Sequence, residues 1–251
     1  MQTVHRLLDI VEILAKDSNQ RLKDITKISG LNKSTAYRFL KTLIDQGYVY
    51  KNEIDETYNL TFKIVSLSRD FINNFNINHY AREYLEKISN QCGETIHLTT
   101  INNDSIVYID KIEAKNKSIL VSSYIGKMQP LYSTASGKIF LSYMNDAEFN
   151  ETWDRLDKQP KTKNTIINKN KMLAEIKNVK TAGYAIDDQE NEEGIACISC
   201  PVFNLDNKAI YAISITLPLI NNLSTYKEKL LSFLPFLQEN TQELSKKLGS
   251  S

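Results

Sequence analysis

Cysteines, histidines and long apolar runs are scarce in this chain of 251 residues. Three cysteines so far apart predict no disulfide framework of the kind that holds small secreted domains together. No unbroken apolar run reaches about 18 residues, the length that a membrane-spanning helix needs. The first segment, MQTVHRLLDIVEIL, carries acidic residues among its apolar ones, unlike a signal peptide. We therefore expect a cytoplasmic protein with no membrane partner.

The sequence also lacks the motifs of common enzymes, including a phosphate loop, a dinucleotide fingerprint and a nucleophile elbow. Ser136, His97 and Asp187 could be imagined as a hydrolase triad, but their order and spacing fit no known pattern. Cys197 and Cys200 form a CxxC pair, yet residues three apart in a strand point to opposite faces and cannot chelate one ion. We predict no enzymatic activity, no cofactor and no metal site.

What the chain does contain is a local concentration of positive charge. At 41% hydrophobic residues it can bury a core, and its length suits two domains. Its net charge of +1 says little about partners, but residues 21–51 hold seven Lys or Arg against two Asp or Glu. That local excess of positive charge indicates a candidate surface for an anionic partner.

The same basic segment has the apolar spacing of two short helices. Residues 22–29 predict a helix with Leu22, Ile25 and Ile28 facing inward, which Gly30 ends. A second helix follows over 33–46, so the pair has the helix-turn-helix pattern. Alternating residues on both sides of NEIDET then predict a β-hairpin, which completes a winged helix. DNA binding is favoured over a small helical domain with a solvated basic face.

The exposed face of the 33–46 helix carries hydroxyls, an aromatic ring and cations, and Asn32 stands where an N-cap is expected. Such side chains neutralise phosphates or reach base edges. Tyr37 has an alternative role in packing against a neighbouring part of the protein, and Thr35 in capping its own helix. We predict DNA contacts at Lys33, Ser34, Thr35, Tyr37, Arg38, Lys41 and Lys51.

The rest of the chain mixes helical and strand periods, which predicts an α+β domain. We expect the winged helix-turn-helix domain over 1–61, a linker helix over 62–76 and the second domain over 77–251. Its expected strands lie near 94–101, 105–112, 118–124, 184–187, 195–203 and 209–217. Its expected helices lie near 78–91, 134–143, 146–156, 169–181 and 225–248.

Four stretches of the sequence, in order and spacing, resemble the IclR family of bacterial transcriptional regulators: TVHRLLDIVEIL, LKDITKISGLNKSTAYRFLKTLIDQGYV, PLYSTASGKIFLS and GYAIDDQENEEGIACISCPVFN. The resemblance covers nearly the whole chain. It implies an N-terminal winged helix-turn-helix domain and a C-terminal GAF-like α/β domain that binds a small molecule. It also implies a dimer, or a dimer of dimers, on palindromic promoter DNA, and a small organic acid as effector.

The segment STASGK at 133–138 opens a helix with small residues, where free backbone amides and the helix dipole attract an anion. Ala135, Ser136 and Gly137 would let a carboxylate approach closely, although small residues also serve tight packing. The resemblance implies polar ligand contacts at Asp187 and Cys197, and pocket walls at Val121, Gln129 and Ile195. It departs at Tyr132 and Ala196, where the family commonly has His and Arg. His97 is expected either in the pocket wall or as a donor into the pocket.

These features together predict a sequence-specific DNA-binding transcriptional regulator, with repression favoured over activation. A small carboxylate would modulate its affinity for the operator. Two alternatives remain: a ligand-sensing or interaction module that no longer grips DNA, and a small-molecule hydrolase.

Overall fold

The computed structural model describes residues 2–74, 76–115, 122–219 and 224–250. The chain divides into two compact units, residues 1–75 and 76–251. Within the described residues, no helix is long and apolar enough to cross a membrane.

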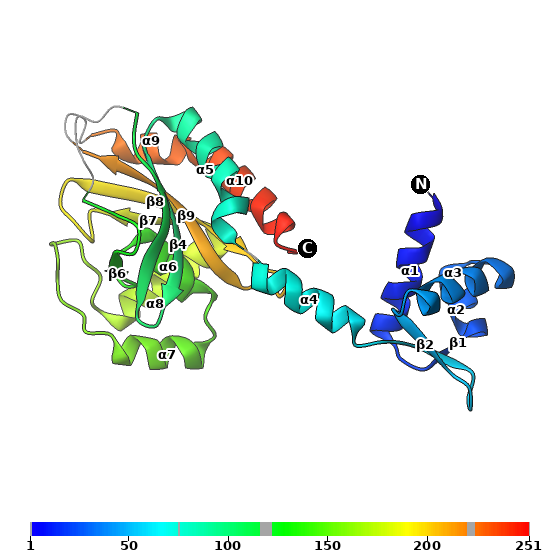
Figure 1. The fold of residues 1–251 in the computed structure, drawn as a ribbon. Coiled ribbons are helices and arrows are strands. Elements are labelled where there is room, and N and C mark those ends of the chain that lie inside the picture. The colour runs from blue at the N-terminus through cyan, green and yellow to red at the C-terminus, as the bar shows by residue number, and fades with distance from the viewer. Residues whose placement is uncertain (1, 75, 116–121, 220–223, 251) are drawn as a thin grey trace. The chain divides into compact units, whose positions relative to one another are not determined.

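The N-terminal unit is a winged helix-turn-helix domain followed by a helix (Figure 1). Its three-stranded antiparallel sheet has the order β1-β3-β2, in which β2 and β3 form the wing and the two-residue strand β1 pairs with β3. The sequence predicted the hairpin but not β1, which is too short to show an alternating pattern. The elements are α1 (Gln2–Lys16), β1 (Gln20–Arg21), α2 (Leu22–Ser29), α3 (Lys33–Asp45), β2 (Val49–Asn52), β3 (Thr57–Leu60) and α4 (Lys63–Asn74).

Local sequence fixes the turn between α2 and α3. Gly30 ends α2 with φ +68, a left-handed conformation that glycine adopts without a Cβ penalty. Asn32 begins α3, because its side chain accepts a hydrogen bond of 2.9 Å from the Thr35 backbone amide. The end of α2 and the start of α3 are as the sequence predicted. Because Asn32 caps α3, Thr35 is not the capping residue.

A small apolar core holds this unit together, with Ile10 and Ile25 fully buried among residues from α1, α2, α3 and the wing. The prediction that Ile28 also faces inward is wrong, since its side chain is 60% exposed. Each step of three residues shifts the side-chain direction by about 60° around the helix, so Ile28 lies about 120° from Leu22, at the margin of the face that Ile25 presents to the core.

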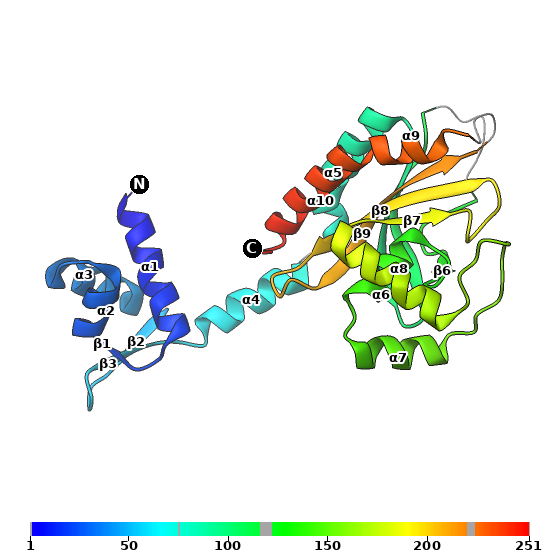
Figure 2. The same ribbon diagram turned by 180° about the vertical axis from the view of Figure 1, so that it is seen from behind.

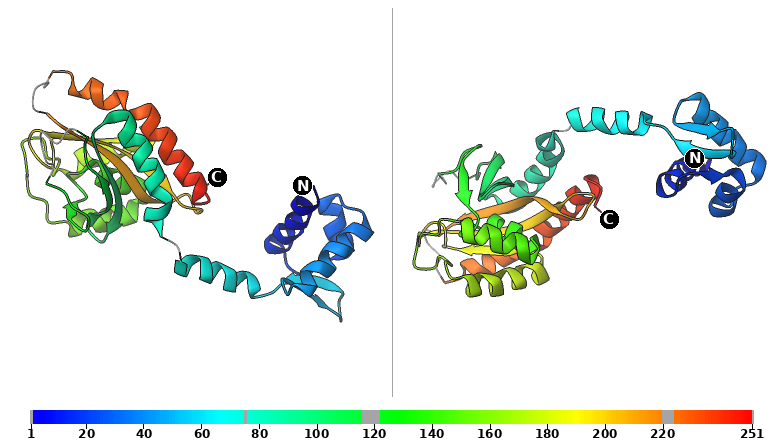
Figure 3. Two further views of the ribbon diagram at one scale, coloured as in Figure 1. Left: turned by 45° about the horizontal axis from the view of Figure 1, so that its top comes forward. Right: turned by 90° about the horizontal axis from the view of Figure 1, so that it is seen from below.

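The C-terminal unit is an α/β domain built on a six-stranded antiparallel sheet of order β6-β5-β4-β9-β8-β7. Helices α5 and α10 lie side by side on one face, and α6 and α8 cover the other (Figures 1, 2 and 3). The strands are β4 (Thr95–Asn102), β5 (Ser105–Ile112), β6 (Met128–Pro130), β7 (Ala185–Asp188), β8 (Ile195–Phe203) and β9 (Ala209–Pro218). The helices are α5 (Ile77–Cys92), α6 (Ala135–Tyr143), α7 (Asp146–Arg155), α8 (Lys169–Ala182), α9 (Tyr226–Ser232) and α10 (Leu234–Lys247).

Two expectations for this domain are corrected. The predicted helix over 225–248 is two helices, α9 and α10, because Pro235 lacks an amide hydrogen and its ring clashes with the carbonyl four residues earlier. The predicted strand near 118–124 is not formed at residues 122–124, and residues 118–121 lie outside the described part. The strand at the edge of the sheet beside β5 is β6, which the sequence did not indicate; β7 forms the other edge.

Strand β8 separates two apolar cores. Ala196, Ile198 and Cys200 belong to the core beneath α5 and α10. Cys197, on the opposite face, packs against the core beneath α6 and α8. The predicted opposition of Cys197 and Cys200 is thus confirmed.

Candidate functional site

The exposed face of α3 carries side chains without charged partners. Lys33, Arg38 and Lys41 are exposed, and none forms an ion pair among the described residues. The Tyr37 ring is 53% exposed, so packing inside its own unit does not explain it. The Ser34 hydroxyl donates a hydrogen bond of 2.8 Å to the side-chain oxygen of Asn32 at the start of the helix. This helix therefore presents unneutralised cations and polar groups to the surroundings.

A groove lies between α2, the start of α3 and the wing. It brings together Lys33, Ser34, Tyr37 and Lys51, which the sequence predicted, with Arg21 and Lys23, which it did not. Arg21 and Lys23 could have been predicted, because both belong to the same basic segment, residues 21–51. The remaining lining residues are Leu22, Thr26, Glu56 and Tyr58.

Lys51 differs from the other cations of this surface. Its Nζ lies 3.3 Å from Glu53 Oε2 and 3.5 Å from Glu56 Oε1. The hydrogen bond to Glu53 is the chief cause of the raised pKa of Lys51, with a further contribution from Glu56. Lys51 is thus already paired within the wing.

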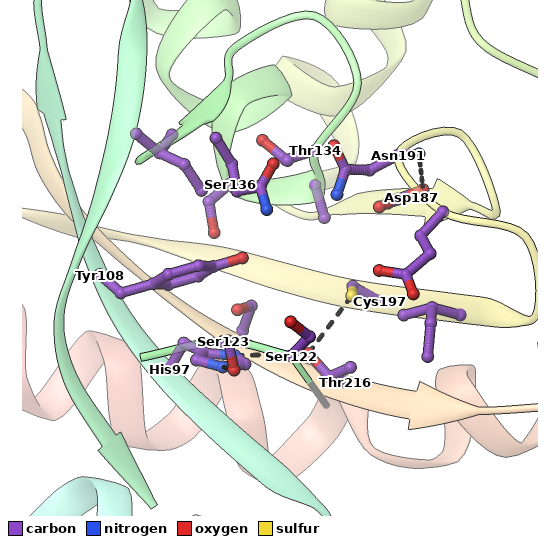
Figure 4. A pocket seen from close by; sticks show the side chains of 16 residues that line it. His97, Tyr108, Ser122, Ser123, Thr134, Ser136, Asp187, Asn191, Cys197 and Thr216 are labelled. Atoms are coloured by element: carbon purple, nitrogen blue, oxygen red, sulfur yellow. Dashed lines mark hydrogen bonds between the residues drawn. The ribbon is translucent and has the colours of Figure 1, made fainter. Parts of the chain in front are cut away.

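A cavity in the C-terminal unit lies between the start of α6 and the strands beneath it (Figure 4). Its volume of about 40 Å³ has room for a few water molecules. Six predicted residues line it: Gln129, Ala135, Ser136, Asp187, Ile195 and Cys197. Residues that the sequence did not assign also line it: Ile106, Tyr108, Ser122, Ser123, Thr134, Asn191, Glu192, Ser214 and Thr216, together with His97, for which a wall role was one of two expectations.

Two other predicted pocket residues stand apart. Val121 lies outside the described residues. Gly137 does not line the cavity: a Cβ at this position would lie 2.1 Å from the backbone oxygen of Leu131. Its small size therefore permits close packing of α6 on the preceding segment, the alternative that the sequence left open.

The start of α6 offers backbone donors to the cavity. Thr134 caps the helix by accepting a hydrogen bond of 3.1 Å from the Gly137 amide. The amides of Ala135 and Ser136 have no acceptor among the described residues. Since both residues line the cavity, these amides and the positive end of the helix dipole form a candidate site for an anionic group.

Asp187 is the principal ionisable group of the wall and is almost fully buried. Its Oδ1 accepts hydrogen bonds from the backbone amides of Glu190 (2.6 Å) and Asn191 (3.3 Å). Burial raises the pKa of Asp187 to about 7, although these bonds act in the opposite direction. Near neutral pH this carboxyl can accept or donate a hydrogen bond.

The histidine and the cysteine of the cavity belong to a hydrogen-bonded cluster. His97 Nε2 lies 2.8 Å from Ser123 Oγ, and its Nδ1 lies 3.3 Å from Thr216 Oγ1. Burial lowers the pKa of His97 to about 3 and raises that of the Cys197 thiol, so both are neutral. Ser136 Oγ instead contacts Ser199 Oγ at 3.1 Å. Among the described residues no hydrogen bond links Ser136, His97 and Asp187 as a catalytic triad would require.

Behind the cavity wall lies a buried charge cluster. Lys138 on α6 is 1% exposed, and its Nζ lies 2.6 Å from Glu190 Oε1 and 2.8 Å from Glu175 Oε1. Burial opposes its charge, but the two carboxylates outweigh burial and raise its pKa. The cluster thereby fixes the loop after β7, which carries Asn191 and Glu192 of the cavity, against α6 and α8.

The two departures from the family pattern do not lie at the cavity. The Tyr132 hydroxyl donates to the Gln159 carbonyl and accepts from its amide. Ala196 is buried on the opposite face of β8. Neither residue lines the cavity.

Two models of one protein family match this chain. Residues 3–53 match the family model described as "IclR helix-turn-helix domain". Residues 70–246 match the model described as "Bacterial transcriptional regulator IclR C-terminal".

Individual proteins are similar over almost the full length. The DNA-binding transcriptional repressor YiaJ of Escherichia coli is 34% identical, with 99% of this chain and 88% of the relative covered. The transcriptional regulator KdgR of the same organism is 30% identical, over 99% and 93% of the two chains. The crystal structure of Thermotoga maritima IclR is 31% identical with a TM-score of 0.65, covering 99% of each chain.

Proposed function

Since this chain belongs to the IclR family of bacterial transcriptional regulators and binds DNA through its helix-turn-helix domain, we propose that it is an effector-controlled repressor of a palindromic promoter site. The exposed, unpaired cations of α3 carry this proposal. Helix α3 would enter the major groove, with Ser34, Thr35 and Tyr37 near its start and Arg38 and Lys41 beyond them. Promoter binding would place the protein in the cytoplasm.

A homodimer, or a dimer of dimers, would supply the second reading helix. A single winged helix makes too few contacts for tight discrimination, so two half-sites are expected. Two stretches of the N-terminal unit expose apolar side chains that could form the shared surface. Val4 and Leu8 are 62% and 50% exposed on α1, and Phe62 and Val65 are 87% and 58% exposed at and within α4.

The proposed effector is a small carboxylate bound in the cavity of the C-terminal unit. Its charged group would meet the Ala135 and Ser136 amides, while Asp187 and Cys197 contact the rest of the molecule. Gln129 and Ile195 would form walls. The cavity volume of about 40 Å³ fits only a few waters, so an effector larger than these would have to enlarge it.

Linkage would connect this cavity with DNA. An effector that binds more tightly to one arrangement of the paired DNA-binding units shifts the population toward that arrangement, and only by its difference in affinity. The spacing of the two α3 helices, and with it the operator affinity, would change.

The test is a gel shift with the promoter fragment upstream of the protein's own gene, in dilute buffer. Small carboxylates selected by a thermal-shift screen would be added in parallel. We expect a retarded complex whose midpoint moves when a stabilising carboxylate is present. Absence of any complex would overturn DNA binding, and a midpoint that no stabilising carboxylate moves would overturn effector control.

A further inference from the structure

The wing of this protein carries more acidic than basic residues. Between β2 and β3 it carries Glu53, Asp55 and Glu56, with Lys51 as its one cation. The side chains of Glu53 and Glu56 are 80% and 77% exposed, whereas that of Lys51 is 26% exposed and lies between them. One cation with two anions gives this group a net negative charge, which phosphates repel.

The opposite side of the groove has the reverse character. Arg21 and Lys23 are exposed and form no ion pair among the described residues. The same holds for Lys33 at the start of α3. Thr26, Ser34 and Tyr37 add hydroxyl groups to the lining. A cation without a carboxylate partner can bind a phosphate without first breaking an existing ion pair.

Strand β1 holds this arrangement in place. Arg21 pairs with Thr57 of β3 through the backbone ladder, so its side chain starts beside the base of the wing. Hydrogen bonds from Thr57, and more weakly the charge of Arg21, lower the pKa of Asp55. Asp55 Oδ1 accepts hydrogen bonds from the Thr57 hydroxyl (2.7 Å) and amide (3.1 Å), and among the described residues Arg21 forms no ion pair with this carboxylate.

Glu56 lines the groove as well, and it would oppose an anion there. Its charge is only partly offset by Lys51, whose Nζ lies 3.5 Å from Glu56 Oε1 and also pairs with Glu53. The remaining ionisable cations of the lining are Arg21, Lys23 and Lys33, and they leave the groove positive.

We propose that the DNA backbone is held on the α2 side of this groove by Arg21 and Lys23, and that Lys51 and the tip of the wing make no phosphate contact. The inference rests on the proposed function, because it requires α3 to lie on DNA. It replaces Lys51, expected from the sequence to bind phosphate, with two residues of β1 and α2. It also gives the wing a different role: the negative charge of its acidic tip repels phosphates and so weakens any binding mode in which the wing follows the DNA backbone.

The experiment measures how affinity for DNA depends on salt. Fluorescence anisotropy would follow full-length protein on a labelled duplex of its own promoter fragment and on an unrelated duplex of equal length. Each lost phosphate contact lowers the slope of log affinity against log salt by about 0.9, or about threefold in affinity over a fourfold range of salt. Slopes are compared per bound protomer.

Three variants separate the possibilities. Arg21→Gln with Lys23→Gln is expected to reduce the slope by about 1.8 on both duplexes. Lys51→Gln is expected to leave the slope unchanged, as is the control Lys180→Gln on the exposed side of α8. Circular dichroism and thermal midpoints check that all variants fold, and a double variant that fails this check is replaced by the single changes to Gln.

Two results would overturn the inference: a slope unchanged by the Arg21 and Lys23 substitutions, or a slope reduced by Lys51→Gln as much as by one of them. Both leave the proposed function standing, because the wild type still binds DNA. Failure of the wild type to bind either duplex in dilute buffer would instead overturn the proposed function together with the inference.

Discussion

In the N-terminal unit Arg38 and Lys41 are exposed and unpaired among the described residues, whereas in the C-terminal unit Lys138 is almost fully buried and bonded to two carboxylates. The first arrangement leaves charge free to act on a polyanion and contributes little to stability. The buried cluster neutralises the Lys138 charge inside the protein and holds a loop in place. The difference shows that exposure and pairing, more than the number of cations, separate a DNA-binding surface from a structural cluster.

The largest expected effect comes from breaking the buried cluster. Lys138→Met leaves Glu190 and its unpaired Oε2 buried without a counter-charge, which costs about 3–5 kcal/mol of the free energy of unfolding. Denaturant unfolding of the purified variant measures this loss. Lys180→Met, at an exposed position of α8, serves as control and should change stability by less than about 0.5 kcal/mol. Equal midpoints for the two variants would contradict a structural role of the cluster.

The next effect concerns Asp187 and pH. Its native pKa of about 7 exceeds the ordinary value of 3.8, so between these values the native state holds a proton that the unfolded state has lost. The contribution of Asp187 to stability therefore falls as pH rises from 4 to 7 and is constant above, by about 4 kcal/mol in all.

Comparison with Asp187→Asn isolates this contribution, because the amide keeps an oxygen for the Glu190 amide and does not titrate. Unfolding free energies measured from pH 4 to 8 should favour the variant progressively over the wild type as pH rises. Parallel pH profiles for the two proteins would show that the buried carboxyl does not titrate in this range.

On the exposed surface the expected effect is on binding alone. Arg38→Ala removes an unpaired cation of α3 and should weaken operator binding by about tenfold to hundredfold, as for a side chain at the DNA interface. The thermal midpoint should not move, since the Arg38 side chain is exposed and forms no hydrogen bond or ion pair among the described residues. A gel shift equal to that of the wild type would remove Arg38 from the interface.

The smallest expected effect concerns the turn that positions α3. At Gly30 a Cβ would meet no atom within 4 Å, so Gly30→Ala suffers only from the left-handed φ of +68 and should cost about 1 kcal/mol. Gly137→Ala sharpens the contrast, because there a Cβ would overlap the Leu131 backbone. Unfolding that ranks Gly30→Ala as the more harmful change would refute this account of the two glycines.

Elements with strong local signals could be predicted from the sequence. The cap at Asn32, the stop at Gly30 and the bounds of β5 depend on neighbouring residues only, and the structure confirms them. The break between α9 and α10 also has a local signal, Pro235. The prediction missed it because the apolar pattern continues across this residue.

The rest depends on contacts distant in sequence. Strand β6 has three residues and exists because β5 pairs with it, while the burial of Lys138 requires Glu190, 52 positions away. His97 and Thr216 meet at the cavity across 119 positions. No periodicity within a short window can show such partners, so the position of the cavity was predicted but most of its lining was not.

Strand β8 sets a limit on how this protein can change in evolution. Its even-numbered residues from Ala196 to Val202 fill one core, while Cys197 and Ser199 face α6 and the cavity. Insertion or deletion of a single residue here would exchange the two sets, placing Ser199 among aliphatic side chains and an aliphatic group at the cavity side. Length variation among descendants of this sequence should therefore be confined to the connecting loops, and changes in the chemistry of the cavity should arise by substitution at alternate positions of this strand.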